Sequence, residues 1–222
     1  MSLRRPVTAV VPLFNGGRFI AEAIASIRSQ TVRVAQIIVV DDGSTDDGPA
    51  VVAAMPEVTL IRKPHTGIGE TVNAGVTAAH GDLIAFLDAD DRWLPDKTAR
   101  QLAALEQDPG LAVVFGHARR FVDHDGRERM LDVRPAISRC AGLFRRTAIE
   151  AAGPFGTGQD HEFMTWMFAA QDAGLRYEIV PDIVFERRIH GANHGVAFKG
   201  DQRQAYFVTL KAALDRRRRS VE

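Results

Sequence analysis

The sequence predicts an α/β domain built on a mostly parallel sheet, because apolar runs alternate with amphipathic segments along its first half. The clearest run spans residues 83–91 and begins as five apolar residues. Such a run is typical of a strand that is buried on both faces by helices. It ends in three carboxylates, Asp88, Asp90 and Asp91. Open α/β sheets place their ligands at this end of a strand.

The rest of the first half repeats the same alternation. Strands are expected at residues 7–11, 36–40 and 58–61, and the strand that begins at 83 follows them. Helices are expected at about 18–29 and over 97–107. A short helix is expected before residue 58, and another helix is expected to end at about residue 79. Strands separated by helices in this way indicate right-handed crossovers between parallel neighbours.

The pattern changes after about residue 108. A strand is expected at 112–116, followed by a hairpin with Asp125 and Gly126 at its tip. Beyond the hairpin we expect helices at 145–152 and 163–173, strands at 176–180 and 184–189, and a helical tail from about 201. We therefore expect one domain with two halves, residues 1–108 and residues 109–222.

Composition excludes several classes of protein. Lys and Arg balance Asp and Glu at 28 each, so no net charge attracts the chain to nucleic acid. The single cysteine, Cys140, excludes an internal disulfide framework and is expected to be a small buried side chain. No signal peptide and no apolar run of about 20 residues is present. These features predict a soluble, cytoplasmic protein.

Two strands end in carboxylates, and this pairing predicts a ligand site. Asp41 and Asp42 follow the strand at 36–40, as Asp88 to Asp91 follow the strand at 83. Carboxylates so close together repel one another and stay ionised more easily with a divalent cation between them. The alternatives are a turn at Asp42 and Gly43, and Asp91 acting as the cap of the next helix.

Taken together, these motifs resemble those of the GT-A inverting glycosyltransferases of family two. The resemblance covers most of the chain. It is carried by the strand ends at 10–15, 39–46 and 86–91, and by Asn73-Ala-Gly75, Gly153-Pro-Phe155 and Gln159-Asp160. It implies a GT-A fold, with a nucleotide-diphospho-sugar donor bound by the first half and an acceptor bound by the second. The acceptor would be a glycan, a lipid-linked molecule or a small molecule.

The resemblance also implies roles for individual residues on the donor side. Asp88 would contact the ribose and Asp90 a Mn²⁺ or Mg²⁺ ion that bridges the diphosphate, with Asp91 as a second metal contact. Asp42, with Asp41 behind it, would face the nucleobase, and Pro12 to Phe14 would form the wall beside the base. Arg62 would help to neutralise phosphate. His190 would complete the metal coordination or contact the diphosphate.

On the acceptor side, Asp160 is the expected general base, because inversion requires a carboxylate that takes the proton of the attacking hydroxyl. Glu162 is the reserve candidate. Trp166 is expected to be a core residue, with a sugar-stacking platform as the alternative. Relatives often carry an Arg where this chain has Val72, which leaves one donor contact open. Many also carry an Arg near the place of Trp166 and Met167, which affects the acceptor side. Relatives often have Glu where this chain has Gln159, but Asp160 is retained beside it.

Two further readings stay open beside the transferase. One is a nucleotidyltransferase that makes the sugar nucleotide, although 15–18 is a poor phosphate loop. The other is a binding module without activity. The tail, with Arg216 to Arg219 at its end, is expected to pack on the domain, and contact with anionic lipid at the inner face of the membrane is the alternative. A homodimer is compatible with all of these readings.

Overall fold

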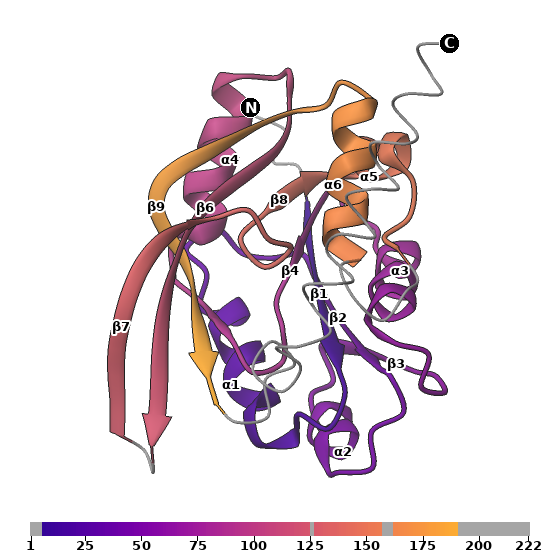
Figure 1. Ribbon diagram of the computed structural model, residues 1–222. Coiled ribbons are helices and arrows are strands. Elements are labelled where there is room, and N and C mark those ends of the chain that lie inside the picture. The colour runs from indigo at the N-terminus through magenta and orange to yellow at the C-terminus, as the bar shows by residue number, and fades with distance from the viewer. Residues whose placement is uncertain (1–5, 125–126, 157–161, 191–222) are drawn as a thin grey trace, which may run out of the picture.

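The parallel sheet expected for the first half is present in the computed structural model, which describes residues 6–124, 127–156 and 162–190 (Figure 1). Its strands lie in the order β3-β2-β1-β4 and are all parallel. Their bounds are Val7–Leu13 for β1, Gln36–Asp41 for β2, Val58–Arg62 for β3 and Leu83–Phe86 for β4. The expected helices are α1 Gly17–Arg28, α2 Gly48–Ala53, α3 Ile68–Ala78 and α4 Lys97–Gln107.

The order of the strands places the helices on both faces of the sheet. The chain moves outward from β1 to β3 and then returns to β4, and right-handed crossovers put outward and returning helices on opposite faces. Helix α3, on the returning crossover, packs closely on β1. A Cβ atom at Gly75 would lie 2.3 Å from Val10 Cγ1, so this position on α3 requires glycine.

The second half extends the sheet with strands of mixed direction. The short strand β8, Leu143–Arg145, joins β4 to β6, Leu111–His124, and is antiparallel to both. Strand β9, Arg176–Ile189, is parallel to β6. Strand β7, Arg127–Ala136, forms the expected hairpin with β6. The two-residue strand β5, Arg92–Trp93, pairs with the end of β9. Helices α5, Arg146–Ala152, and α6, Glu162–Asp172, pack against each other.

The structure differs from the sequence-based expectation in three elements. The strands expected at 176–180 and 184–189 form one strand, because pairing with β6 resumes at Ile183, beyond Pro181, after a shift of register. Strands β5 and β8 are too short to show a period and were not expected. The hairpin tip at 125–126 and the helical tail beyond residue 190 lie outside the described residues.

Aromatic side chains fill the core between the sheet and α6. Trp166 is 1% exposed and stacks on Phe155, with the ring centroids 5.5 Å apart. The edge of the Phe144 ring meets Trp166 from β8. The expectation that Trp166 is a core residue is therefore confirmed. In the part of the chain that the structure describes, no helix is both long and apolar enough to cross a membrane.

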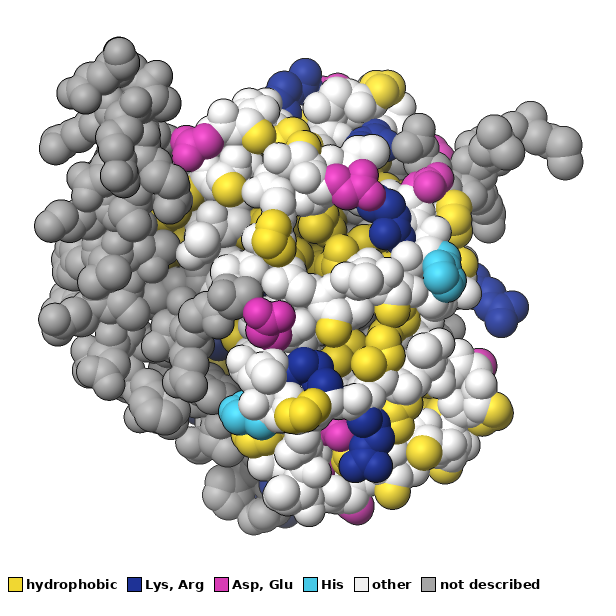
Figure 2. Space-filling model, turned by 90° about the vertical axis from the view of Figure 1, so that its right-hand side faces the viewer, with side chains coloured by type: hydrophobic (Ala, Val, Ile, Leu, Met, Phe, Trp, Pro, Cys, Tyr) yellow, Lys and Arg dark blue, Asp and Glu magenta, His cyan; other side chains and the backbone are white. Residues whose placement is uncertain are grey.

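Charged side chains on the side of the molecule that carries α3 and β3 show no excess of one sign (Figure 2). Basic and acidic groups are scattered there among apolar and uncharged polar ones, in line with the balanced composition. The described residues of this face therefore form no broad basic surface for a polyanion.

Candidate active site

Loops that follow β1 and β2 meet at the lower edge of the sheet in Figure 1, where the parallel strands end. The Asn15 side chain accepts a hydrogen bond from the backbone of Thr45 at 2.8 Å, and the Ser44 hydroxyl accepts one from the backbone of Asn15 at 2.9 Å. The Asp46 carboxylate accepts a hydrogen bond from the backbone of Gly17 at 2.7 Å. The Asn and Ser-Thr-Asp parts of the two motifs therefore fix one loop to the other.

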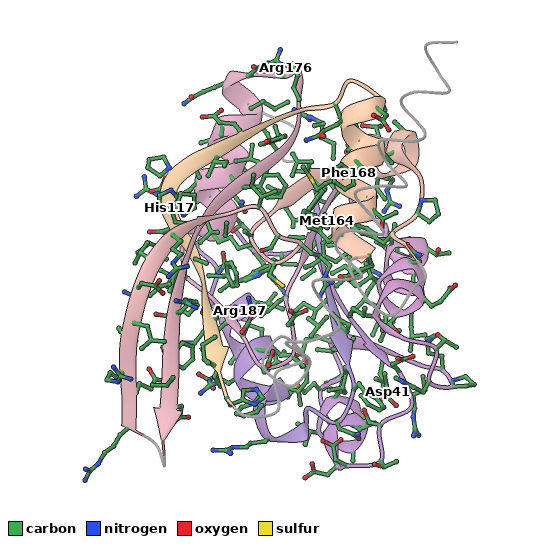
Figure 3. The ribbon with its side chains drawn as sticks, in the orientation of Figure 1. Asp41, His117, Met164, Phe168, Arg176 and Arg187 are labelled. Atoms are coloured by element: carbon green, nitrogen blue, oxygen red, sulfur yellow. The ribbon has the colours of Figure 1, made fainter. Side chains whose placement is uncertain are left out.

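Asp41 ends β2 and is 1% exposed (Figure 3). Its carboxylate accepts a hydrogen bond from the backbone of Ser44 at 3.0 Å and lies 3.4 Å from Nε of Arg62, its register partner on β3. Three strand spacings separate β3 from β4, or about 14 Å. Arg62 therefore lies at the far end of the edge from Asp88, and its contact with phosphate stays a prediction.

Asp42 organises the loop between β3 and α3. Its carboxylate accepts hydrogen bonds from the backbone of Thr66 and Gly67, each at 3.0 Å. It also pairs with Lys63, and Nδ1 of His65 lies 2.8 Å from it. Burial alone would raise the pKa of Asp42, but the Lys63 ammonium and the two backbone donors hold it below its usual value. Asp42 is thus ionised and buried, and its carboxylate has four partners in this loop. Its contact with a nucleobase stays a prediction.

Beside Asp42 lies an exposed aromatic pair. The ring of Phe14 is stacked on His65 with the centroids 4.3 Å apart, and Phe14 is 43% exposed. Pro12 lies within β1 and is buried. An exposed flat ring at the end of a parallel strand is suited to stacking against a planar base.

Asp88 follows β4 and pairs with Arg139. Burial alone would raise the pKa of Asp88, but the Arg139 guanidinium holds it below its usual value. The thiol of Cys140 lies in the same cluster. Burial and the charge of Asp88 raise the pKa of this thiol well above its ordinary value, so that it stays protonated at neutral pH.

Asp90 lies beside His190, at the end of β9. Nε2 of the imidazole is 3.0 Å from Oδ2 of the carboxylate, and both side chains are about a quarter exposed, at 23% and 26%. The ring of Phe19 on α1 packs against the imidazole at 5.0 Å between centroids. Burial and the neighbouring charge of Asp88 raise the pKa of Asp90, and His190 offsets part of this effect.

Asp91 lies deeper, at 4% exposure. Its Oδ1 accepts a hydrogen bond from the backbone of Arg188 at 2.9 Å, which ties the turn after β4 to β9. Burial, together with the charges of Asp88 and Asp90, raises the pKa of Asp91 well above its usual value. Asp91 is thus both a structural link and a neighbour of the other two carboxylates.

The residues present fit a divalent cation. Ligand atoms of Asp88, Asp91 and Cys140 lie within 4.8 Å of one another. A protonated thiol is a poor ligand, whereas carboxylate oxygens and a neutral imidazole suit Mn²⁺ or Mg²⁺. Burial and mutual repulsion raise the pKa values of Asp90 and Asp91, and a bound cation would favour their ionised forms. The predicted metal contacts of Asp90, Asp91 and His190 stay predictions.

On the acceptor side, α6 begins at Glu162. Its carboxylate pairs with Arg139, the same arginine that holds Asp88. Asp160, the expected base, lies outside the described residues, as do Gln159 and Asn193.

Two motifs that are distant in the sequence hold each other. The side-chain amide of Asn73 on α3 donates a hydrogen bond to the carbonyl of Phe155 at 3.0 Å, and its oxygen accepts one from the backbone of Phe155 at 2.9 Å. Asn73-Ala-Gly75 and Gly153-Pro-Phe155 therefore form one structural unit.

Sequence reasoning missed the arginines of this site. Arg139, Arg187 and Arg188 lie in stretches without a motif, and nothing local in the sequence distinguishes them from surface arginines. The Arg187 side chain comes from β9, and its positive charge favours the ionised forms of Asp88 and Asp91 (Figure 3). His65 and Lys63 were also missed, although both stand in the polar loop that follows β3.

Comparisons with known proteins identify the family to which this chain is similar. The model of "Glycosyl transferase family 2" matches residues 8–173. Among curated relatives, the succinoglycan biosynthesis protein ExoO of Rhizobium meliloti is 33% identical over 165 residues, which are 73% of this chain and 47% of that protein. A hyaluronan synthase of Pasteurella multocida is 26% identical over 227 residues, or 95% of this chain and 23% of that protein. The chain spans 23% to 39% of the length of the first curated relatives that it matches.

Solved structures share the fold. The mannosyltransferase PcManGT from Pyrobaculum calidifontis, in complex with GDP-Man and Mn²⁺, superposes with a TM-score of 0.70 at 21% identity, covering 88% of this chain and 60% of that one. S. aureus TarS in complex with UDP-GlcNAc superposes with a TM-score of 0.69 at 19% identity, covering 85% and 60%. The GT-A fold expected from the sequence is confirmed.

Proposed function

The chain belongs to glycosyl transferase family 2, and on that premise we propose that it is a metal-dependent, inverting glycosyltransferase of the hexosyltransferase type. It would move a sugar from a nucleotide-diphospho-sugar to a hydroxyl of a glycan, a lipid-linked molecule or a small molecule. The observation that carries this proposal is the set of carboxylates at the ends of two parallel strands that flank β1, with Asp42 after β2 and Asp88 and Asp90 after β4. The names of the relatives, a hyaluronan synthase and a succinoglycan biosynthesis protein, support a role in cell-envelope glycan synthesis.

The two halves of the chain have separate tasks in this proposal. Residues 1–108 bind the donor, with the nucleobase against Phe14 and His65 and the ribose near Asp88. Residues 109–222 bind the acceptor. Neighbours of known structure support such a donor, because they were solved with UDP, UDP-GlcNAc or GDP-Man.

Asp90 and His190 are the residues that would hold Mn²⁺ or Mg²⁺, with Asp91 beside them. A bound cation would neutralise charge on the departing diphosphate, so that no protein acid is needed there. Arg187 would help to neutralise the same charge, because its guanidinium already favours the ionised forms of Asp88 and Asp91.

Asp160 is the proposed general base. Its carboxylate would take the proton of the acceptor hydroxyl as the hydroxyl oxygen bonds to the anomeric carbon and the bond to the phosphate oxygen breaks. The position of Glu162 supports this choice indirectly. Its carboxylate is already engaged by the guanidinium of the buried Arg139.

Binding of the donor is tested first, with UDP and GDP as probes. Asp90→Asn removes a carboxylate charge from the cluster without changing its size. We expect the wild type to bind one of the two nucleotides in the presence of Mn²⁺, and the variant to lose that metal-dependent affinity while its melting temperature stays the same. Calorimetry that finds equal affinity for both proteins would contradict the assignment of Asp90.

The base is tested by turnover measured beside donor affinity. We expect Asp160→Asn to lower turnover by about a hundredfold or more, as expected for the loss of a general base, while donor affinity stays unchanged. Glu162→Gln should cost much less. Normal turnover in Asp160→Asn together with an inactive Glu162→Gln would identify Glu162 as the base instead.

A further inference from the structure

The turn at residues 138–142, between β7 and β8, is rigidly held inside the protein. The side chain of Gln101 on α4 donates hydrogen bonds to the carbonyls of Val114 and Ala141, each at 2.7 Å. The ammonium of Lys97, one helical turn earlier, lies 3.2 Å from the carbonyl of Gly142 and 2.7 Å from the side-chain oxygen of Gln101. The side chains of Gln101 and Lys97, which are 0% and 1% exposed, thus hold the backbone of this turn in place.

Arg139 projects from this turn between the two halves of the site. One terminal nitrogen of its guanidinium pairs with Asp88 after β4, and the other pairs with Glu162 at the start of α6. Arg139 is 7% exposed, and its Nε has no hydrogen-bond partner among the described residues. The arginine therefore bridges a donor-side carboxylate and the first residue of an acceptor-side helix.

Stability alone is a weak reason for this arrangement. A buried ion pair seldom stabilises a fold more than apolar side chains of the same volume, and a buried N–H without a partner is costly. Arg139 bears both costs in a turn that α4 already holds in place. A guanidinium is the group best suited to fix two carboxylates at once, because its planar donors are set at fixed angles.

We propose that Arg139 is a positioning residue that couples the donor site to α6. The proposal rests on the proposed function, in which Asp88 contacts the donor. A donor that binds at Asp88 fixes this carboxylate, Arg139 then lies in one position, and Glu162 and the start of α6 are ordered with it. Binding on one half of the molecule is thereby transmitted to the other half through two ion pairs.

Hydrogen exchange measured with and without nucleotide tests this coupling without any need for turnover. The probes are UDP and GDP, each with Mn²⁺. In the wild type, we expect the nucleotide that binds to slow the exchange of amides in α6 as well as in the loops after β1 and β3. In Arg139→Gln, we expect the slowing to persist in the two loops and to be lost in α6.

Two variants separate coupling from a loss of structure. Glu162→Gln removes the other end of the bridge and should give the same exchange pattern as Arg139→Gln. Arg146→Gln is the matched control, because Arg146 holds the carbonyls of Ala79 and Gly81 at the opposite edge of the sheet, and it should leave the response of α6 intact.

Turnover provides the second readout. Arg139→Gln should lower kcat by about tenfold, within the usual range for coupling between two sites, with little change in donor affinity. The double variant with Glu162→Gln should lose no more than either single variant, because both act through one bridge. If nucleotide still slows the exchange of α6 in Arg139→Gln as it does in the wild type, or if the losses of turnover are additive, the coupling alone is overturned. Failure of both nucleotides to bind the wild type would overturn the proposed function and the coupling with it.

Discussion

The two halves of the molecule meet at one edge of one sheet, but different forces hold them there. Loops of the first half are held chiefly by hydrogen bonds to backbone groups, as between Asn15 and Thr45, and Asn73 of this half holds the backbone of Phe155 in the second half in the same way. The second half is held by buried arginines. Arg139 joins Asp88 to Glu162, and Arg188, at 3% exposure, joins Asp123 to Glu22.

The difference follows from how the strands run. Parallel strands end at the same edge, so residues that follow them are brought together by the topology and need only short polar links. The second half reaches that edge by a hairpin and by β9, which come from far away in the sequence. Long arginine side chains span these gaps, and they place positive charge behind a row of carboxylates that would otherwise repel one another.

The largest effect that this comparison predicts is for Arg188→Met. The Arg188 guanidinium pairs with two carboxylates, donates to the carbonyl of Asp90 at 3.1 Å, and packs against the rings of Phe19 and Phe121. Its loss removes a buried charge that interacts with two carboxylates, a carbonyl and two rings, and we expect the free energy of unfolding to fall by about 3 to 5 kcal/mol. Urea unfolding measures it.

Arg176→Met is the control for that experiment. Arg176 pairs with Asp108, but the two side chains are 59% and 42% exposed. An exposed pair contributes little, so the change should stay below about 1 kcal/mol. Equal losses in the two variants would mean that burial does not distinguish the arginines of the second half.

The second prediction concerns Lys97, which supports the turn that carries Arg139. Burial lowers its pKa from 10.5 to about 7. Below pH 7 the ammonium is charged in both the folded and the unfolded chain, and the cost of burying it is paid in full. Between about pH 7 and 10.5 the folded protein has released this proton while the unfolded chain still binds it, so the free energy of unfolding rises with pH.

Lys97→Met removes this dependence. We expect the stability of the wild type relative to the variant to rise by on the order of 3 kcal/mol between pH 7.5 and 9.5, at about 1.4 kcal/mol for each pH unit. Urea unfolding of both proteins at several pH values measures the difference, in which the other titrating groups cancel. A difference that does not change with pH would show that Lys97 is charged in the folded protein.

The sequence predicted the first half nearly completely, since strand ends and helices there are marked by local periods and turn residues. The second half shows where such reasoning stops. The strand at 176–189 contains Pro181 and was read as two, because its pairing with β6 is not visible in its own residues. Strand β8 has three residues, too few for a period, and β5, in the first half, was missed for the same reason with two.

The candidate site divides in the same way. Its carboxylates follow strands and were predicted from their position, as was His190, which lies beside Asp90. Their roles stay predictions. Arg139 and Arg188 were not found, because their partners lie between 23 and 166 residues away and each pair depends on the folded topology. Spacing within a motif carries no information on such contacts.

The smallest of the three effects is expected in the first half, for Asn73→Ala. The Asn73 amide makes two hydrogen bonds to the backbone of Phe155, a residue that is 0% exposed. Without the amide, a buried N–H and a buried carbonyl are left without partners, and we expect the free energy of unfolding to fall by about 2 kcal/mol. Thr77→Ala is the control on the same helix. It removes one exposed hydrogen bond, to the carbonyl of Asn73, and should change stability by less than about 0.5 kcal/mol.

Salt distinguishes this loss from the loss in the second half. The bonds between Asn73 and Phe155 join neutral groups, so the difference between wild type and Asn73→Ala should be the same at low and at high ionic strength. The difference for Arg188→Met should shrink as salt is added, because its partner Glu22 is 44% exposed and therefore screened. Urea unfolding of both variants at two salt concentrations makes the comparison. If the two differences respond to salt alike, the halves are not held by different forces.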